Sequence, residues 1–137
     1  MQKEINASLS ELDKVARYLE EHIPDDAILF LTGDLAAGKT TLGSAIARSR
    51  GIESGVTSPT FSLQQRYGDR LFHYDLYRID NESFFELGLH EAFDEPGWHL
   101  VEWADEALKS FLVNAGYNTA SISITPVGES RNYSIEV

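Results

Sequence analysis

A glycine-rich segment that ends in lysine and threonine carries the clearest chemical signal in this sequence. Its residues, GDLAAGKT from Gly33 to Thr40, match the pattern G-x-x-x-x-G-K-[ST] in full. In such a loop, backbone N–H groups and the N-terminus of the next helix bind the phosphates of a nucleotide. The Lys39 ammonium would neutralise oxygens of the β- and γ-phosphates, and the Thr40 hydroxyl would bind Mg²⁺. An ordinary glycine-rich turn is disfavoured, because a buried strand is expected before the segment and a helix after it.

Hydrolysis of a nucleotide also needs a carboxylate on the metal side, at the end of a strand beside the strand that leads into the loop. Two acids compete for this role. Glu102 ends an apolar run that includes Leu100 and Val101, and Asp75 lies in the strand-like segment HYDLYR. A lone acid at a strand end is usually a solvated or capping residue, but the apolar surroundings of Glu102 weaken that interpretation. Both acids therefore stay candidates.

Other polar residues give weaker signals. The hydroxyl-rich segment TSPT at 57–60 is either a turn with a helix cap or a switch loop that senses the γ-phosphate or Mg²⁺. Arg78 pairs either with a phosphate or with a neighbouring carboxylate. The four histidines lack the spacing of metal ligands, and we interpret them as structural or surface residues.

The elements that must position these residues follow from apolar spacing and turn signals. A helix over 8–22 is predicted by apolar residues at three- and four-residue spacing, by a capping box and by Pro24 after it. Continuous apolar runs predict strands buried on both faces over 27–32 and 98–103. The remaining predicted elements are a helix over 40–49, strands over 61–67 and 71–77, short helices over 82–89 and 104–112, and a hairpin of strands over 120–125 and 132–137. We expect an α/β fold, P-loop NTPase-like, with three α/β/α layers and a mixed central sheet.

The composition excludes several classes of protein. A chain of 137 residues suits a single domain over 1–137, and the absence of cysteine removes disulfides, thiolate zinc sites and cysteine nucleophiles. The net charge of −11 argues against a protein that binds DNA or RNA backbones by bulk electrostatics. Neither a membrane span nor a signal peptide is recognisable. We therefore expect a cytoplasmic protein.

Several motifs in one order make the sequence similar to a known family. They are GDLAAGKTT at 33–41, TSPTF at 57–61, HYDLYR at 73–78, ELG at 86–88 and VEW at 101–103. This set resembles the TsaE (YjeE) family of bacterial P-loop ATPases over most of the chain. The Walker motif alone would be unspecific, whereas SPTF, HYDLYR and VEW in this order are highly specific.

The resemblance implies a function in tRNA modification. The family takes part in making N6-threonylcarbamoyladenosine at position 37 of tRNAs that read ANN codons. Its members bind and slowly hydrolyse ATP, with Mg²⁺, and act with TsaB and TsaD. The tRNA would be reached indirectly through that complex, with neither DNA nor a membrane as a partner.

The resemblance also implies roles for individual residues. Lys39, Asp75 and Glu102 are implied as catalytic residues, with Asp75 near the γ-phosphate and with Thr40 and Glu102 as ligands of Mg²⁺. The nucleotide-binding residues are implied to be Gly33, Asp34, Leu35, Ala36, Ala37, Gly38, Lys39, Thr40, Thr41, Thr60, Trp103 and Arg131. The family usually has glycine where this chain has Ala36. If that position needs a positive φ, alanine costs about 1 kcal/mol.

Two other functions stay open from the sequence. A small-molecule P-loop kinase would share the loop, but it usually needs several arginines and a lid, and this chain has only seven arginines. A nucleotide-gated binding module would bind nucleotide without useful turnover.

The acidic residues are unevenly distributed. Nine acids and no lysine or arginine lie between Asp80 and Glu106. A solvated acidic face is the simpler interpretation. The hypothesis beside it is that part of this surface docks onto a basic patch of the partner complex.

Overall fold

The computed structural model describes residues 2–33, 38–52, 64–68, 70–77, 79–86 and 88–137. Within these residues the chain forms both helices and strands. The strands are β1 (Gln2–Ala7), β2 (Ala27–Thr32), β3 (Gln64–Tyr67), β4 (Leu71–Asp75), β5 (Trp98–Glu102), β6 (Thr119–Val127) and β7 (Ser130–Glu136). The helices are α1 (Leu12–His22), α2 (Lys39–Ser49), α3 (Asn81–Glu86) and α4 (Glu106–Asn114), with two 3₁₀ turns, η1 (Leu9–Glu11) and η2 (Leu89–Asp94).

In the described part of the chain, seven strands form one mixed sheet in the order β1-β7-β6-β2-β5-β4-β3. The four central strands, β6, β2, β5 and β4, run parallel to one another. The outer strands β7, β1 and β3 pair antiparallel. Because β2, β5 and β4 are parallel, their carboxyl ends meet at one edge of the sheet. Ligands in open α/β folds bind at that edge.

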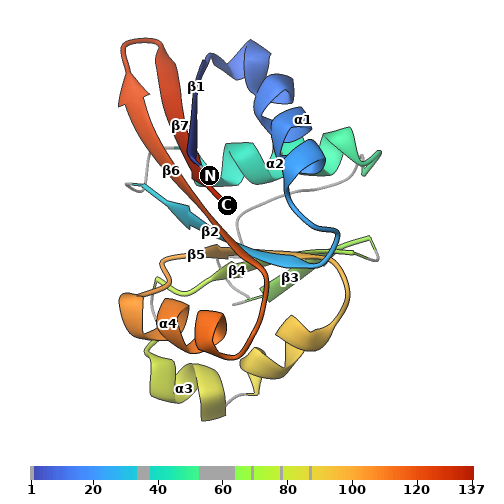
Figure 1. Ribbon diagram of the computed structural model, residues 1–137, viewed down its shortest axis with the longest axis vertical. Helices are drawn as coiled ribbons and strands as arrows, with labels where there is room; N and C mark the ends of the chain where they lie inside the picture. The colour runs from blue at the N-terminus through green and yellow to red at the C-terminus, as the bar shows by residue number, and fades with distance from the viewer. Residues whose placement is uncertain (1, 34–37, 53–63, 69, 78, 87) are drawn as a thin grey trace.

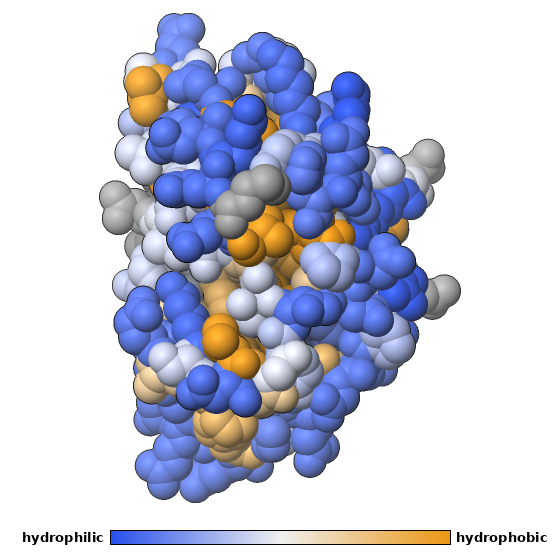
Figure 2. All heavy atoms as spheres, in the orientation of Figure 1, coloured by the Kyte–Doolittle hydropathy of each residue, from blue (hydrophilic) through white to orange (hydrophobic). Residues whose placement is uncertain are grey.

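Helices cover both faces of the sheet, as Figure 1 shows, with α1 and α2 on one side and α3 and α4 on the other. Side chains of β2 alternate between the two faces because successive side chains of a strand point to opposite sides. Leu29 and Leu31 pack with α1 and α2, while Ile28 and Phe30 pack with α3 and α4. In Figure 2 the surface is mostly hydrophilic, and hydrophobic side chains show between these layers. This confirms the predicted three-layer fold.

Helix α1 follows the predicted pattern. Its buried residues are Leu12, Val15, Ala16 and Leu19, the spacing of one helical face. The predicted capping box is present at the start of η1, the turn before α1, where Glu11 Oε1 accepts a hydrogen bond from the backbone N–H of Ser8 at 3.1 Å. The helix ends before Pro24, which cannot continue it.

Three elements differ from the sequence prediction. Strand β1 was not predicted, because it is an exposed edge strand with Ala7 as its buried residue. The helix predicted over 82–89 is two shorter elements, α3 and η2, with Gly88 at φ +73° just before η2. The last predicted helix begins at Glu106 rather than 104, because the Asp105 side chain caps it by accepting a hydrogen bond from Leu108 N at 2.8 Å.

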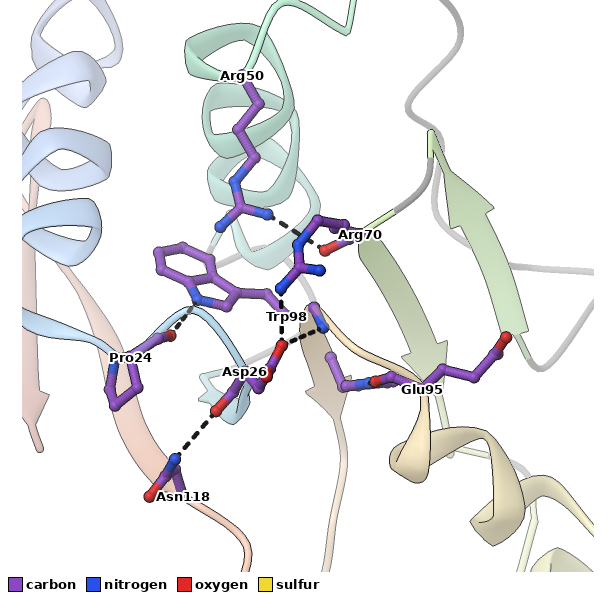
Figure 3. A network of polar contacts seen from close by, with 9 residues as sticks. Pro24, Asp26, Arg50, Arg70, Glu95, Trp98 and Asn118 are labelled. Carbon is purple, nitrogen blue, oxygen red and sulfur yellow. Dashed lines mark hydrogen bonds and ion pairs between the residues drawn. The ribbon is translucent and has the colours of Figure 1, made fainter.

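A polar network lies at the edge of the sheet opposite to these carboxyl ends, where β2 and β5 begin (Figure 3). Asp26 Oδ1 accepts hydrogen bonds from Arg70 Nη2 and from the backbone N–H of Gly97, both at 2.8 Å. Trp98 Nε1 donates to the Pro24 carbonyl at 2.8 Å. Gly97 has φ +129°, and a Cβ there would lie 2.4 Å from the Arg70 carbonyl oxygen. Only glycine fits this close approach.

Among the described residues, no helix is long and apolar enough to cross a bilayer.

Candidate functional site

The site begins where the central strand β2 ends and α2 starts. Gly38 is the N-cap of α2, with φ +101°, and its carbonyl accepts the hydrogen bond from Leu42 N at 3.0 Å. The glycine is required there because side chains rarely adopt such a positive φ. The N–H groups at the first turn of α2 and the helix dipole make this end suitable for an anion. Residues 34–37, which complete the predicted phosphate loop, lie outside the described residues.

Lys39, the first residue of α2, is buried, with 4% of its surface exposed. Its Nζ donates a hydrogen bond to the Gly33 carbonyl at 2.6 Å. The same ammonium lies 4.2 Å from the centroid of the Trp103 ring. Lys39 thus spans the start and end of the predicted loop and lies against Trp103. The predicted nucleotide-binding residues Gly33, Lys39 and Trp103 are therefore brought together.

Arg131 reaches the same place from β7, which lies on the opposite flank of β2 from β5. It lies on β7, paired with Ala7 of β1 and Pro126 of β6. A Cβ placed on Gly38 would lie 3.2 Å from Arg131 Nε. That Nε is buried, and no hydrogen-bond partner for it exists within the described residues. A buried N–H of a guanidinium without a partner next to a helix N-terminus favours an anionic ligand.

Glu102 stands at the carboxyl end of β5, the strand beside β2. It pairs in register with Leu31, two residues before Gly33. Only 4% of its surface is exposed, so Glu102 is not the solvated acid that the sequence left open as an alternative. Its Oε2 contacts His73 Nε2. The predicted metal-side carboxylate therefore lies on the neighbouring strand, as a phosphate-loop site requires.

Asp75 ends β4, the next strand of the sheet. It is the register partner of Glu102, and the backbone N–H of Leu76 donates to the Glu102 carbonyl at 3.1 Å. Asp75 Oδ1 accepts a hydrogen bond from Tyr77 N at 3.0 Å, so its carboxylate also closes a turn. The two acids that competed for one role in the sequence are thus neighbours at one edge of the sheet.

Trp103 follows Glu102 with φ +66°, the one positive φ of a non-glycine residue in the described ranges. Its ring packs against Tyr77, with centroids 4.8 Å apart. Such a backbone persists only where its surroundings hold it, and such residues cluster at functional sites. This conformation lets Glu102 face α2 while the indole turns toward Lys39. A hollow of about 90 Å³ beside Gly33 is lined by Trp103 and by Lys109 of α4.

The electrostatics of the neighbouring elements are set by burial and capping. Hydrogen bonds from Asn81 and from the backbone of Leu108 lower the pKa of the Asp105 carboxyl, which suits an acid at a helix N-terminus. Burial lowers the pKa of His99 and raises that of Tyr74, on the sheet face opposite Glu102.

The other predicted site residues divide into two groups. Thr40 and Thr41 lie in the first turn of α2, next to Lys39. The predicted residues Asp34, Leu35, Ala36, Ala37 and Thr60 lie outside the described residues, as does Arg78.

Sequence reasoning missed one residue of the candidate site. This residue is His73, which was interpreted only as a structural or surface residue. A signal was present, since His73 precedes Asp75 by two residues and so lies on the same face of the strand.

The mixed sheet and the lysine at the start of α2 define the class of the protein: it is an α/β protein with a P-loop NTPase-like fold. The family model described as "Threonylcarbamoyl adenosine biosynthesis protein TsaE" matches residues 6–133. The chain therefore belongs to the TsaE family, as the motifs predicted.

Individual relatives agree with this assignment. The tRNA threonylcarbamoyladenosine biosynthesis protein TsaE of Bacillus subtilis is 41% identical over 112 residues, which cover 74% of this chain and 70% of that protein. The protein of the same name from Haemophilus influenzae is 35% identical over 122 residues, covering 82% of this chain and 77% of the relative. The crystal structure of Bacillus subtilis YdiB superposes with a TM-score of 0.67 and 26% identity, covering 98% of this chain and 86% of that chain.

Proposed function

We propose that this chain is the ATP-binding and slowly hydrolysing subunit of the bacterial machinery that makes N6-threonylcarbamoyladenosine at position 37 of tRNA, acting with TsaB and TsaD. One observation carries the proposal. Glu102 at the end of β5 lies beside the strand that leads into the glycine- and lysine-containing loop. The names of the relatives support the pathway.

The residues around the start of α2 fit a nucleotide. The N–H groups of its first turn and the orphaned Nε of Arg131 beside Gly38 offer hydrogen bonds to phosphate oxygens. Lys39, whose ammonium donates to the Gly33 carbonyl at 2.6 Å, would exchange that contact for the same oxygens. The remaining predicted nucleotide-binding residues would complete the loop.

The donor set also fits Mg²⁺. Thr40 and Glu102 would hold the ion, and Asp75 lies beside Glu102 in register. Among the described residues, no group of three or more His, Asp or Glu side chains could hold a metal ion alone. The cation would therefore depend on phosphate oxygens for further ligands. When bound, it would neutralise negative charge on the phosphate oxygens.

The acidic surface supports indirect contact with tRNA. Nine acids and no lysine or arginine lie between Asp80 and Glu106, and all of these acids except the buried Glu102 are exposed. An acidic surface repels a phosphate backbone and suits a basic protein surface, so tRNA would be reached through TsaB and TsaD. DNA and membranes are not partners in this proposal, and the machinery is cytoplasmic.

The test is reconstitution with purified TsaB and TsaD. Multiple-turnover modification of tRNA that requires both ATP and this chain would support the proposal. Single-turnover phosphate release, measured alone and with the partners, separates an ATPase from a nucleotide-gated binding module. Release no faster than the uncatalysed rate in both cases would favour the module, and a phosphorylated metabolite in a screen with ATP would favour a kinase.

A further inference from the structure

A buried histidine lies directly behind the carboxylate that we assign to the metal. His73 is on β4 and Glu102 is on β5, two parallel neighbours in the sheet. In their register His73 pairs with Leu100, while Asp75 pairs with Glu102. Because side chains two apart point to the same face, these residues all face the layer of α1 and α2. The imidazole therefore reaches diagonally across to the Glu102 carboxylate.

The contact between the two side chains is enclosed by the protein. His73 is fully buried and Glu102 is 4% exposed. His73 Nε2 contacts Glu102 Oε2. An ionised carboxylate can only accept hydrogen bonds, so Nε2 is the donor in this pair. The structure gives Glu102 Oε1 no hydrogen bond within the described residues, which leaves that oxygen available to a cation.

The rest of the imidazole is held by packing. A methyl group placed on Gly43 of α2 would lie 3.8 Å from both Cε1 and Nδ1 of His73 and 3.6 Å from Leu100. The second turn of α2 thus lies next to the ring, with space for about one carbon atom between them. Nδ1 is buried, and it has no hydrogen-bond partner in the described ranges. The polar contact of this ring is therefore directed at Glu102 alone.

A second buried histidine shows what a purely structural histidine looks like in this sheet. His99 of β5 is 1% exposed. Its Nδ1 bonds to the Tyr74 hydroxyl at 2.6 Å, and its Nε2 bonds to the Glu95 carbonyl at 2.8 Å. Both of its nitrogens are satisfied, as is usual for buried polar atoms. His73 keeps one nitrogen unpaired beside the candidate metal ligand, a local cost that proteins accept at functional sites.

From these contacts we propose that His73 is a positioning residue: it holds Glu102 Oε2 so that Oε1 stays available to the nucleotide-bound cation. The inference rests on the proposed function, because it takes Glu102 as a ligand of Mg²⁺. Partners of this kind orient metal ligands, and their removal typically lowers metal affinity or activity about 10–100-fold.

The test compares two variants of His73 with a matched control. His73→Phe keeps a ring and removes the donor, while His73→Gln keeps an N–H at a similar reach. His99→Phe removes the other buried histidine, which contacts neither Glu102 nor α2. ADP binding to each full-length protein is measured by calorimetry in EDTA and then over a Mg²⁺ titration, with circular dichroism to check the fold.

We expect the metal dependence, and not the nucleotide affinity itself, to change. For His73→Phe, ADP affinity in EDTA should match the wild type, while the Mg²⁺ concentration that gives half of the metal-dependent gain should rise about 10–100-fold. His73→Gln should recover most of that loss, and His99→Phe should keep the wild-type Mg²⁺ requirement. An unchanged requirement in His73→Phe, or an equal shift in His99→Phe, would overturn the proposal.

Two further observations keep the test decisive. Wild-type protein that binds ADP with no dependence on Mg²⁺ would contradict the metal role in the proposed function itself, and this is seen without any variant. If His73→Phe does not fold, long-range ¹H–¹⁵N NMR of the unaltered protein replaces it. Adding Mg²⁺ to the ADP complex should shift the His73 Nε2 resonance more than either ring nitrogen of His99, and an unshifted His73 resonance would overturn the inference.

Discussion

The ammonium group of Lys39 lies 4.2 Å from the centroid of the Trp103 ring and donates to the Gly33 carbonyl at 2.6 Å. The Lys39 ammonium, which we propose binds phosphate oxygens, thus contacts groups of the protein in this structure. A cation over an indole face is stabilised by about 0.5–2 kcal/mol, depending on how far it is desolvated. A nucleotide that recruits Lys39 has to replace both contacts. The environment of the Trp103 ring should therefore report nucleotide binding.

The first prediction uses the two tryptophans of the chain. ADP binding should change the intrinsic fluorescence of the protein, because Lys39 leaves the Trp103 ring. Trp98 is the matched control, since it lies under Arg50, 4.1 Å from the guanidinium carbon, and its Nε1 bonds to Pro24. The change should persist in Trp98→Phe and vanish in Trp103→Phe. A signal that survives in Trp103→Phe would contradict the movement of Lys39.

The second prediction concerns Lys39 itself. Lys39→Ala should weaken ADP and ATP binding about 10–150-fold, because hydrogen bonds to charged groups contribute about 1.5–3 kcal/mol. ATP hydrolysis should be lost with it. Lys14→Ala is the control, since this exposed lysine of α1 pairs with Glu11 at 2.8 Å and lies outside the candidate site. Calorimetry gives the affinities, and normal hydrolysis by Lys39→Ala would refute the phosphate-loop assignment.

The third prediction concerns Arg131, whose Nε lies buried beside Gly38. Arg131→Gln should weaken ADP binding about tenfold or more, because a charged donor to the nucleotide is removed. Arg17→Gln on the exposed face of α1 carries the same change in net charge and should leave the affinity unaltered. If both variants lose affinity equally, the effect is one of net charge, and Arg131 has no specific role.

The local parts of the site could be predicted from the sequence, and the parts that depend on strand register could not. The loop spacing around Lys39 and the apolar run before Glu102 are local patterns, so both residues were found. The contact of His73 with Glu102 depends on how β4 pairs with β5, which no local pattern encodes. Strand β1 was missed for a different reason. It lies at the edge of the sheet and is mostly exposed, so it lacks the apolar alternation that identifies a strand.

The conformation of Trp103 was equally beyond sequence reasoning. Its φ of +66° is unfavourable for a residue with a large side chain, and the sequence suggests only that the strand continues to it. The packing of Tyr77 and Lys39 on the indole provides contacts that compensate for this cost. Sequence propensity fails here because tertiary contacts at the candidate site override it.

The last prediction concerns pH and His99, at the edge of the sheet opposite to Lys39. Burial lowers the pKa of His99 below its usual 6.5, while hydrogen bonding to Glu95 and the charges of Glu95 and Asp26 partly offset that effect. The unfolded chain therefore binds a proton at a higher pH than the folded chain does. It follows that the neutral ring stabilises the fold fully above pH 6.5, and that this stability is lost as the pH falls through the folded-state pKa.

The free energy of unfolding should thus decrease between pH 7.5 and 5.5, with His99 contributing at most about 1.4 kcal/mol per pH unit. Urea unfolding at several pH values measures the slope. His99→Gln cannot titrate in this range, and its amide can still donate and accept hydrogen bonds. This variant should be less stable at pH 7.5 but show a shallower decline toward pH 5.5. A decline as steep as that of the wild type would mean that His99 does not take up its proton on unfolding.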